Sequence, residues 1–194
     1  MSYDPLRLAV IVGSTRDGRF GHVVARWFAG QVRTRRDMDL DVIDLAEVEL
    51  PAAHPSGPTP ALDAYLARLD RADAFAIVTP EYNHGYPASL KHAIDLARDE
   101  WKAKPVGFVS YGGISGGLRA VEQLRQVFPE LHATTVRDTV SFAWASRAFD
   151  EAGEPLDAAG CNAAAQTMLD QLAWWGRVLR NARRADAAAS AVVA

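Results

Sequence analysis

The chain of 194 residues fits one domain and is short for two, because a domain takes about 150 residues. Its one cysteine, Cys161, excludes an intramolecular disulfide, a cysteine-rich zinc site and a CxxC redox motif, so we expect a reducing, cytoplasmic setting. A formal net charge of −3 gives no basic field for duplex nucleic acid, and no signal-peptide pattern or membrane-length apolar run is seen.

Apolar runs of strand length alternate with segments of helical periodicity, a pattern typical of βαβ units and a mostly parallel sheet. The expected strands are Arg7–Val12, Leu40–Leu45, Ala74–Thr79, Pro105–Tyr111 and Thr134–Phe142. The expected helices are Phe20–Arg33, Ala61–Ala72, Ala88–Arg98, Leu118–Phe128 and Ala163–Arg180. These elements indicate a doubly wound α/β sheet, in which ligands bind beyond the carboxyl ends of the strands.

Three segments between or beyond these elements are expected to lack regular structure. Pro51–Pro60 holds four prolines and a glycine and predicts a surface loop, and Asp150–Ala159 is a polar excursion. The alanine-rich end loses its periodicity. We therefore expect a single domain over residues 1–183 and a flexible tail over 184–194.

The loop after the first strand, Gly13–Gly21, predicts an anion site, because free backbone N–H groups and a helix dipole converge there. Its GxxxxG spacing lacks the Lys and the Ser or Thr of a nucleotide-hydrolysing P-loop, and Thr15 breaks the GxGxxG pattern of a dinucleotide site. A terminal phosphate held without a metal ion remains, with a polar helix-capping turn as the alternative.

Two further loops follow buried strands and reach the same edge of the sheet. Pro80–Pro87 (PEYNHGYP) offers rigid backbone donors and flat side chains to a planar heteroaromatic ligand, although such residues also form ordinary turns. Gly112–Gly117 (GGISGG) allows a ligand to approach the backbone closely. Together with Gly13–Gly21, these loops predict a composite site.

The three loops resemble the NADPH-dependent FMN reductase family, the flavodoxin-like group that includes quinone, azo-dye and chromate reductases. The resemblance depends on GSTR with GRFG in the first loop, on PEYN with GYP and the following Leu-Lys in the second, and on GG with GGLRA in the third. It runs from about Leu8 to Phe142. It implies a flavodoxin-like, five-stranded parallel sheet of order 2-1-3-4-5 with helices on both faces.

The resemblance also implies which residues contact FMN. The phosphate and ribityl chain would be held by Ser14, Arg16, Arg19, Phe20 and Gly21, although some relatives have Ser and Asn where this chain has Arg19 and Gly21. The isoalloxazine would be bordered by Pro80, Glu81, Tyr82 and Asn83 on one side and by Ser110, Gly112 and Gly113 on the other. No catalytic side chain and no metal ion are implied, since the flavin carries the chemistry.

The implied activity is hydride transfer from NADPH or NADH to bound FMN, followed by transfer of two electrons to a quinone, an azo compound, free flavin or a similar small molecule. Relatives are usually homodimers or dimers of dimers (homotetramers). Trp101, Phe128, Trp174 and Trp175 are therefore candidates for a subunit interface or for the core. Arg119 is expected to pair with an NADPH phosphate, with a subunit neighbour or with a surface carboxylate. The acceptor and the preferred nicotinamide are left open.

Other classes of protein fit less well. A flavodoxin-type carrier would bind FMN without NAD(P)H turnover, but such carriers tend to be far more acidic than −3. A low-molecular-weight tyrosine phosphatase needs an arginine six residues after its cysteine, where this chain has Thr167. The five histidines show no metal-ligand spacing, and a pure interaction module leaves the three loops unexplained.

Overall fold

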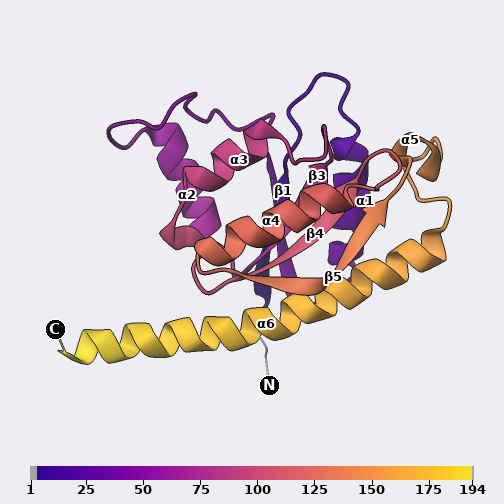
Figure 1. Cartoon of the computed structure of the whole chain (residues 1–194). Helices are drawn as coiled ribbons and strands as arrows, with labels where there is room; N and C mark the ends of the chain where they lie inside the picture. Colours follow the sequence, from indigo (N-terminus) through magenta and orange to yellow (C-terminus); the bar gives the residue numbers. More distant parts are fainter. Residues whose placement is uncertain (1–3, 194) are drawn as a thin grey trace.

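A computed structural model of the chain describes residues 4–193 and contains one five-stranded parallel sheet of order β2-β1-β3-β4-β5. The strands are β1 (Leu6–Val12), β2 (Met38–Asp44), β3 (Ala74–Pro80), β4 (Pro105–Tyr111) and β5 (Thr134–Phe142). The helices are α1 (Gly21–Arg33), α2 (Pro60–Arg71), α3 (Ala88–Asp95), the 3₁₀ helix η1 (Asp99–Trp101), α4 (Leu118–Glu130), α5 (Ala145–Ala148) and α6 (Ala158–Val193). The predicted fold class and strand order are confirmed (Figure 1).

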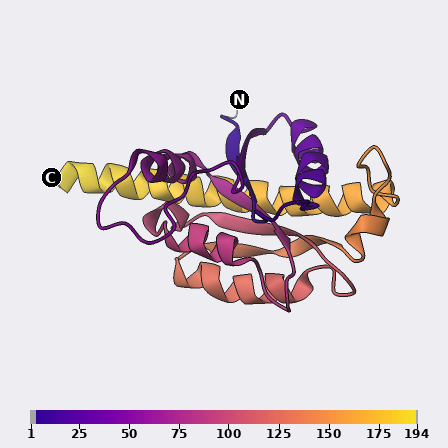
Figure 2. The same cartoon turned by 90° about the horizontal axis from the view of Figure 1, so that it is seen from above.

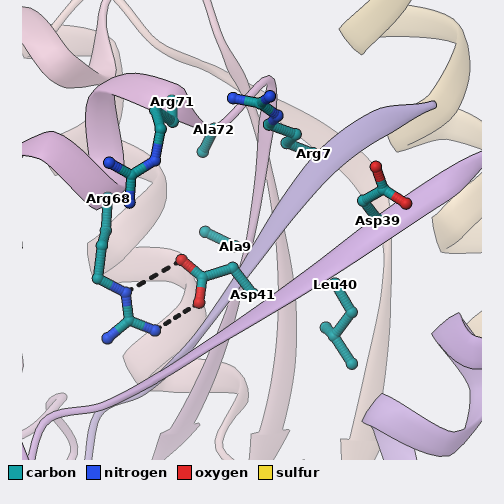
Figure 3. Close-up of a pocket in the computed structure, with 8 residues that line it drawn as sticks. All are labelled: Arg7, Ala9, Asp39, Leu40, Asp41, Arg68, Arg71 and Ala72. Atoms are coloured by element: carbon teal, nitrogen blue, oxygen red, sulfur yellow. Dashed lines mark hydrogen bonds and ion pairs between the residues drawn. The ribbon is translucent and has the colours of Figure 1, made fainter. Parts of the chain in front are cut away.

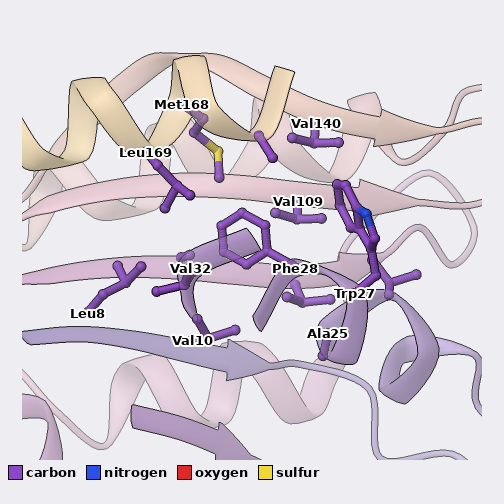
Figure 4. Close-up of a cluster of buried hydrophobic side chains, with 14 of the residues drawn as sticks. Leu8, Val10, Ala25, Trp27, Phe28, Val32, Val109, Val140, Met168 and Leu169 are labelled. Carbon is purple, nitrogen blue, oxygen red and sulfur yellow. The ribbon is translucent and has the colours of Figure 1, made fainter. Parts of the chain in front are cut away.

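Two hydrophobic cores lie on the opposite faces of this sheet. On one face, α1 and α6 pack over the strands, and Phe28 contacts a cluster that includes Val109 and Met168 (Figure 4). On the other face, the cluster contains Trp101 and Phe128. Every residue of β3 and β4 is buried, because helices cover both sides of these central strands.

The four aromatic residues that the sequence assigns either to the core or to a subunit interface differ in burial. Trp101 and Phe128 belong to the core, and the Trp101 indole N–H donates to the Ile94 carbonyl at 3.2 Å. This bond satisfies a carbonyl at the carboxyl end of α3, which ends at Asp95 and not at the predicted Arg98. Trp174 and Trp175 on α6 are exposed, so a core position is wrong for them.

Helix α6 differs most from its predicted extent, since it is longer at each end. It begins at Ala158 because the Asp157 carboxylate accepts the Gly160 N–H at 3.0 Å, as a helix N-cap does. It continues to Val193, through residues expected to form a tail, because alanine has the highest helix propensity even without an amphipathic pattern. Figure 2 shows its carboxyl end projecting beyond the sheet. Flexibility of this end and the single-domain boundary at residue 183 remain predictions.

The amino end of the sheet holds α6 through a cluster of charged side chains. The Asp73 carboxylate accepts hydrogen bonds from Arg180 at 3.2 Å, from Arg183 at 3.1 Å and from the Arg7 backbone N–H at 3.1 Å. Lys104 beside it is buried and donates to the Leu69 carbonyl at 2.9 Å. We call Asp73, Lys104, Arg180 and Arg183 the amino-end cluster. Within the described residues, no helix has the length and apolar character needed to cross a membrane.

Candidate functional site

The loop after β1 presents a run of unused backbone donors. The backbone N–H groups of residues 14–18 donate no hydrogen bond to any described residue, and neither do those of Gly21 and His22 at the start of α1. Gly18, at φ +65°, turns the chain there, and a Cβ on it would meet nothing within 4 Å. This open backbone loop before a helix suits a phosphate group.

Ser14, Arg16 and Tyr82 connect this first loop to the second. The buried Ser14 hydroxyl lies 2.7 Å from the Tyr82 hydroxyl, and the exposed Arg16 guanidinium lies 5.4 Å from the centre of the Tyr82 ring. Figure 1 shows both loops at the end of the sheet where the strands terminate. Arg16 is therefore a cation of the first loop that is available to a phosphate.

Arg19, in contrast, is already occupied by a carboxylate. Its guanidinium forms two hydrogen bonds to Asp44, at 2.5 and 2.7 Å, and a third to the Ser14 carbonyl at 3.0 Å. Asp44 is the last residue of β2, so the pair ties the first loop to the neighbouring strand. The hydrogen bonds to Asp44 raise the pKa of Arg19. The geometry gives Arg19 a bracing role, and direct contact with FMN remains a prediction.

Glu81 links the second loop to α4. Its carboxylate accepts the Arg119 backbone N–H at 3.0 Å and the Arg119 guanidinium at 2.8 Å, so Arg119 pairs with a carboxylate of its own chain. Burial acts to raise the pKa of Glu81, but interactions with Ser115 and Arg119 outweigh it and hold the pKa below its usual value. Glu81 therefore stays ionised, and its ion pair connects the loops after β3 and β4.

The tip of the second loop is held in an unusual backbone conformation. Asn83 and His84 have φ values of +50° and +67°, and their N–H groups donate no hydrogen bond to any described residue. The Gln123 amide donates to the His84 carbonyl at 2.9 Å, and Pro80 is buried at the end of β3. The loop is thus pre-shaped, with two backbone donors open to a ligand.

The third loop is shaped by Ser110 and its glycines. The buried Ser110 hydroxyl donates to the Gly116 carbonyl at 2.8 Å and so holds the loop, and its contact with FMN remains a prediction. Gly117, at φ +89°, has no room for a side chain, because a Cβ would lie 2.7 Å from Ser110. A Cβ on Gly113 would meet nothing within 4 Å, and the Gly113 N–H donates no hydrogen bond to any described residue. Gly112, which directly precedes Gly113, is half-buried.

Tyr111 places a buried, unpaired hydroxyl beside the first loop. Within the described residues, this hydroxyl has no hydrogen-bond partner, and burial raises its pKa, so it keeps its proton. A Cβ on Gly21 would lie 2.6 Å from it, which explains the glycine there. Phe20 packs edge-on against Tyr111 and Phe149 and belongs to the core more than to an open site.

These observations fit a flavin mononucleotide. The free N–H groups of residues 14–18 with Arg16 suit its phosphate, and the open N–H groups of Asn83 and Gly113 suit the polar edge of a flat ring. The structure joins Ser14 to Tyr82, and Glu81 to the start of α4, whereas Arg19, Phe20 and Ser110 make internal contacts. Sequence reasoning missed Tyr111, although it directly precedes the Gly-Gly pair.

A hollow of about 420 Å³ lies away from these loops, at the amino ends of β1 and β2 (Figure 3). Its floor contains Ala9 and Ala72, and Arg68 of α2 forms an ion pair with Asp41 across it. None of the predicted site residues lines this hollow. The loop site and this hollow are therefore separate.

The strand order and the three loops define a flavodoxin-like protein with a cofactor site at the carboxyl edge of its sheet. One solved structure with this fold is the flavoenzyme NAD(P)H:(acceptor) oxidoreductase FerB from Paracoccus denitrificans. It has a TM-score of 0.73 and 22% identity, with 89% of this chain and 97% of that chain covered.

Sequence comparison gives the family. The NADPH-dependent FMN reductase family matches residues 6–146, and the chain belongs to this family. It is 36% identical to an NAD(P)H-dependent FMN reductase of Schizosaccharomyces pombe over 130 residues, which span 62% of this chain and 64% of that protein. It is 30% identical to another from Pseudomonas aeruginosa over 186 residues, 91% of this chain and 98% of that protein. The family's enzymes use NAD(P)H and FMN.

Proposed function

We propose that this protein is an FMN-dependent NAD(P)H oxidoreductase that passes two electrons from the nicotinamide to a small acceptor, such as a quinone, an azo compound or free flavin. The observation that carries the proposal is the unpaired backbone of the first loop, residues 14–18, together with the open donors of Asn83 and Gly113 in the other two loops. Family membership supports the same reading.

Bound FMN supplies hydride acceptance and onward electron transfer, so the side chains need only bind and orient it. Arg16 and the N–H groups of the first loop would hold the phosphate, and Tyr82 stays in place through Ser14. The N–H groups of Asn83 and Gly113 would place partial positive charge beside the ring edge, where negative charge develops on reduction. We propose the remaining predicted residues, Arg19, Phe20, Gly21, Pro80, Glu81, Ser110 and Gly112, as supports of these three loops.

The test begins with an absorption spectrum of the purified protein and an FMN titration followed by flavin fluorescence. NADPH and NADH oxidation are then measured with and without a quinone. Stoichiometric FMN binding and acceptor-dependent oxidation are the expected results. A colourless protein that binds no added FMN and oxidises neither nicotinamide contradicts the proposal. If FMN binds but NADPH does not bleach it rapidly under anaerobic conditions, an electron carrier is favoured.

We also propose a homodimer or a dimer of dimers in the cytoplasm. The exposed Trp174, Trp175 and Val178 on α6 support self-association, because surface apolar clusters tend to be covered by a partner. Light scattering coupled to size exclusion gives the mass directly. A monomer at micromolar concentration contradicts the assembly and leaves the proposed activity untouched.

A further inference from the structure

The segment after β5 is tied to the Gly-Gly pair of the third loop. The Trp144 N–H donates to the Gly113 carbonyl at 2.9 Å, and the Ala145 N–H donates to the Gly112 carbonyl at 3.1 Å. Gly112 in turn donates to the Phe142 carbonyl at 3.1 Å. Trp144 is therefore fixed next to the backbone that we propose as one border of the flavin.

Trp144 has a backbone conformation that its size disfavours. Its φ and ψ are +50° and +48°, the left-handed region, where a bulky side chain is a genuine outlier. Its side chain is nevertheless 55% exposed, so burial in the core does not offset this strain. The Arg147 guanidinium lies 6.0 Å from the centre of the indole. Strained residues of this kind persist mainly at binding and catalytic sites.

A hollow of about 380 Å³ begins at this indole and has mostly apolar walls. Its lining includes Phe142, Ala148 and Leu156, and Leu156 is 71% exposed. Arg147 is the cation of the lining, and Asp157 is its carboxylate. This size suits a small molecule and not a protein surface, and mostly apolar walls with an indole and one cation suit a planar ligand that carries oxygen atoms.

We propose that Trp144 and Arg147 determine the specificity of the reaction for its electron acceptor. Trp144 would stack with a planar, apolar acceptor, and Arg147 would donate to its carbonyl oxygens, as a quinone requires. The inference rests on the proposed function. In the overall reaction the nicotinamide C–H bond breaks, and its two electrons reduce the quinone. The two carbonyls become hydroxyls, with one hydrogen from the hydride equivalent and one proton from water.

The test compares Trp144→Gly with the unaltered enzyme, because glycine accepts a positive φ without strain and keeps the variant folded. We expect the KM for a naphthoquinone to rise about tenfold, the amount a lost aromatic contact accounts for. The KM for ferricyanide, the Kd for FMN and the mass in solution should not change. Trp144→Phe should restore most of the quinone KM, and Val42→Ala, an exposed apolar change on the opposite edge strand, should have no effect.

Two results would overturn the inference. An unchanged quinone KM in Trp144→Gly, with normal oxidation of NADPH, shows that the indole does not contact the acceptor. A changed mass accompanied by equal losses with both acceptors shows that a second copy covers the hollow. Arg147→Ala gives an independent reading, with the quinone KM again expected to rise. If the unaltered enzyme oxidises no nicotinamide with any acceptor, the proposed function fails instead.

Discussion

The two ends of the parallel sheet are held by different sets of contacts. At the amino end, charged side chains are buried and pair with one another, and Asp73 joins α6 to β1 through Arg180 and the Arg7 backbone. At the carboxyl end, the Arg19–Asp44 and Glu81–Arg119 ion pairs hold the loops together with hydroxyl and backbone hydrogen bonds, and several backbone N–H groups are left open. Ion pairs thus fix the chain at both ends, while the carboxyl end also keeps backbone donors for a ligand.

This contrast predicts that stability and cofactor binding can be damaged separately. The four experiments below test that separation, first at the amino-end cluster and then at the loops.

Asp73→Ala should have the largest effect on stability. Arg180 is only 8% exposed and would lose its nearer and more buried carboxylate partner, so the free energy of unfolding should fall by about 3–5 kcal/mol. Urea denaturation measures the change. Asp39→Ala removes an exposed carboxylate on β2 and should stay within about 0.5 kcal/mol of the unaltered protein. Equal denaturation midpoints for the two variants would contradict the role of the amino-end cluster.

Lys104 should make stability depend on alkaline pH. Burial, with the nearby charge of Arg183, lowers its pKa to about 8 from 10.5. Above pH 8 the folded protein releases this proton while the unfolded chain still holds it, so the contribution of Lys104 to stability increases up to about pH 10.5. The total is at most about 3–4 kcal/mol. In Lys104→Met this pH dependence of stability should vanish. If the free energies of unfolding of the two proteins differ by a constant amount over this pH range, Lys104 is not its source.

Glu81→Ala should weaken FMN binding by about 1.5–3 kcal/mol, because hydrogen bonds to a charged group would be lost between the second loop and α4. Arg119→Ala should cost less, since the backbone N–H bond to Glu81 remains. Flavin fluorescence titration gives both values. Because the pKa of Glu81 is lowered, its contribution should be present at neutral pH and lost only in acid. Identical affinities in all three proteins would contradict this.

Ser14→Ala should give the smallest effect, a loss of about 1 kcal/mol in FMN affinity. It removes the Ser14–Tyr82 hydrogen bond and leaves the backbone donors of the first loop in place. Tyr82→Phe removes the same bond from the other side and is the matched variant. If the losses of FMN affinity in the two variants differ widely, one of these hydroxyls contacts FMN directly. The carboxyl end then offers the ligand a side-chain hydroxyl as well as backbone donors.

Continuous apolar runs made the strands predictable, because a strand covered on both faces needs little else. The glycine and PEYN motifs predicted the candidate site because each directly follows such a strand in the sequence. The Arg19–Asp44 pair was not predictable, since its partners are separated along the chain and meet only when β2 lies beside β1. Trp144 was missed because nothing in the residues signals a positive φ for a tryptophan. The full length of α6 was not predictable from periodicity, since its alanine-rich end carries no amphipathic pattern.

The amino-end cluster also decides how the molecule could be attached to a surface. Arg180 and Arg184 reach the carbonyl and carboxylate of Asp4, so the start of β1 lies beside this part of α6, opposite the loops, and α6 continues past it to Val193. Figure 1 shows this arrangement. A linker added at either terminus would orient the carboxyl edge toward solution, so immobilisation on an electrode should leave the acceptor side accessible.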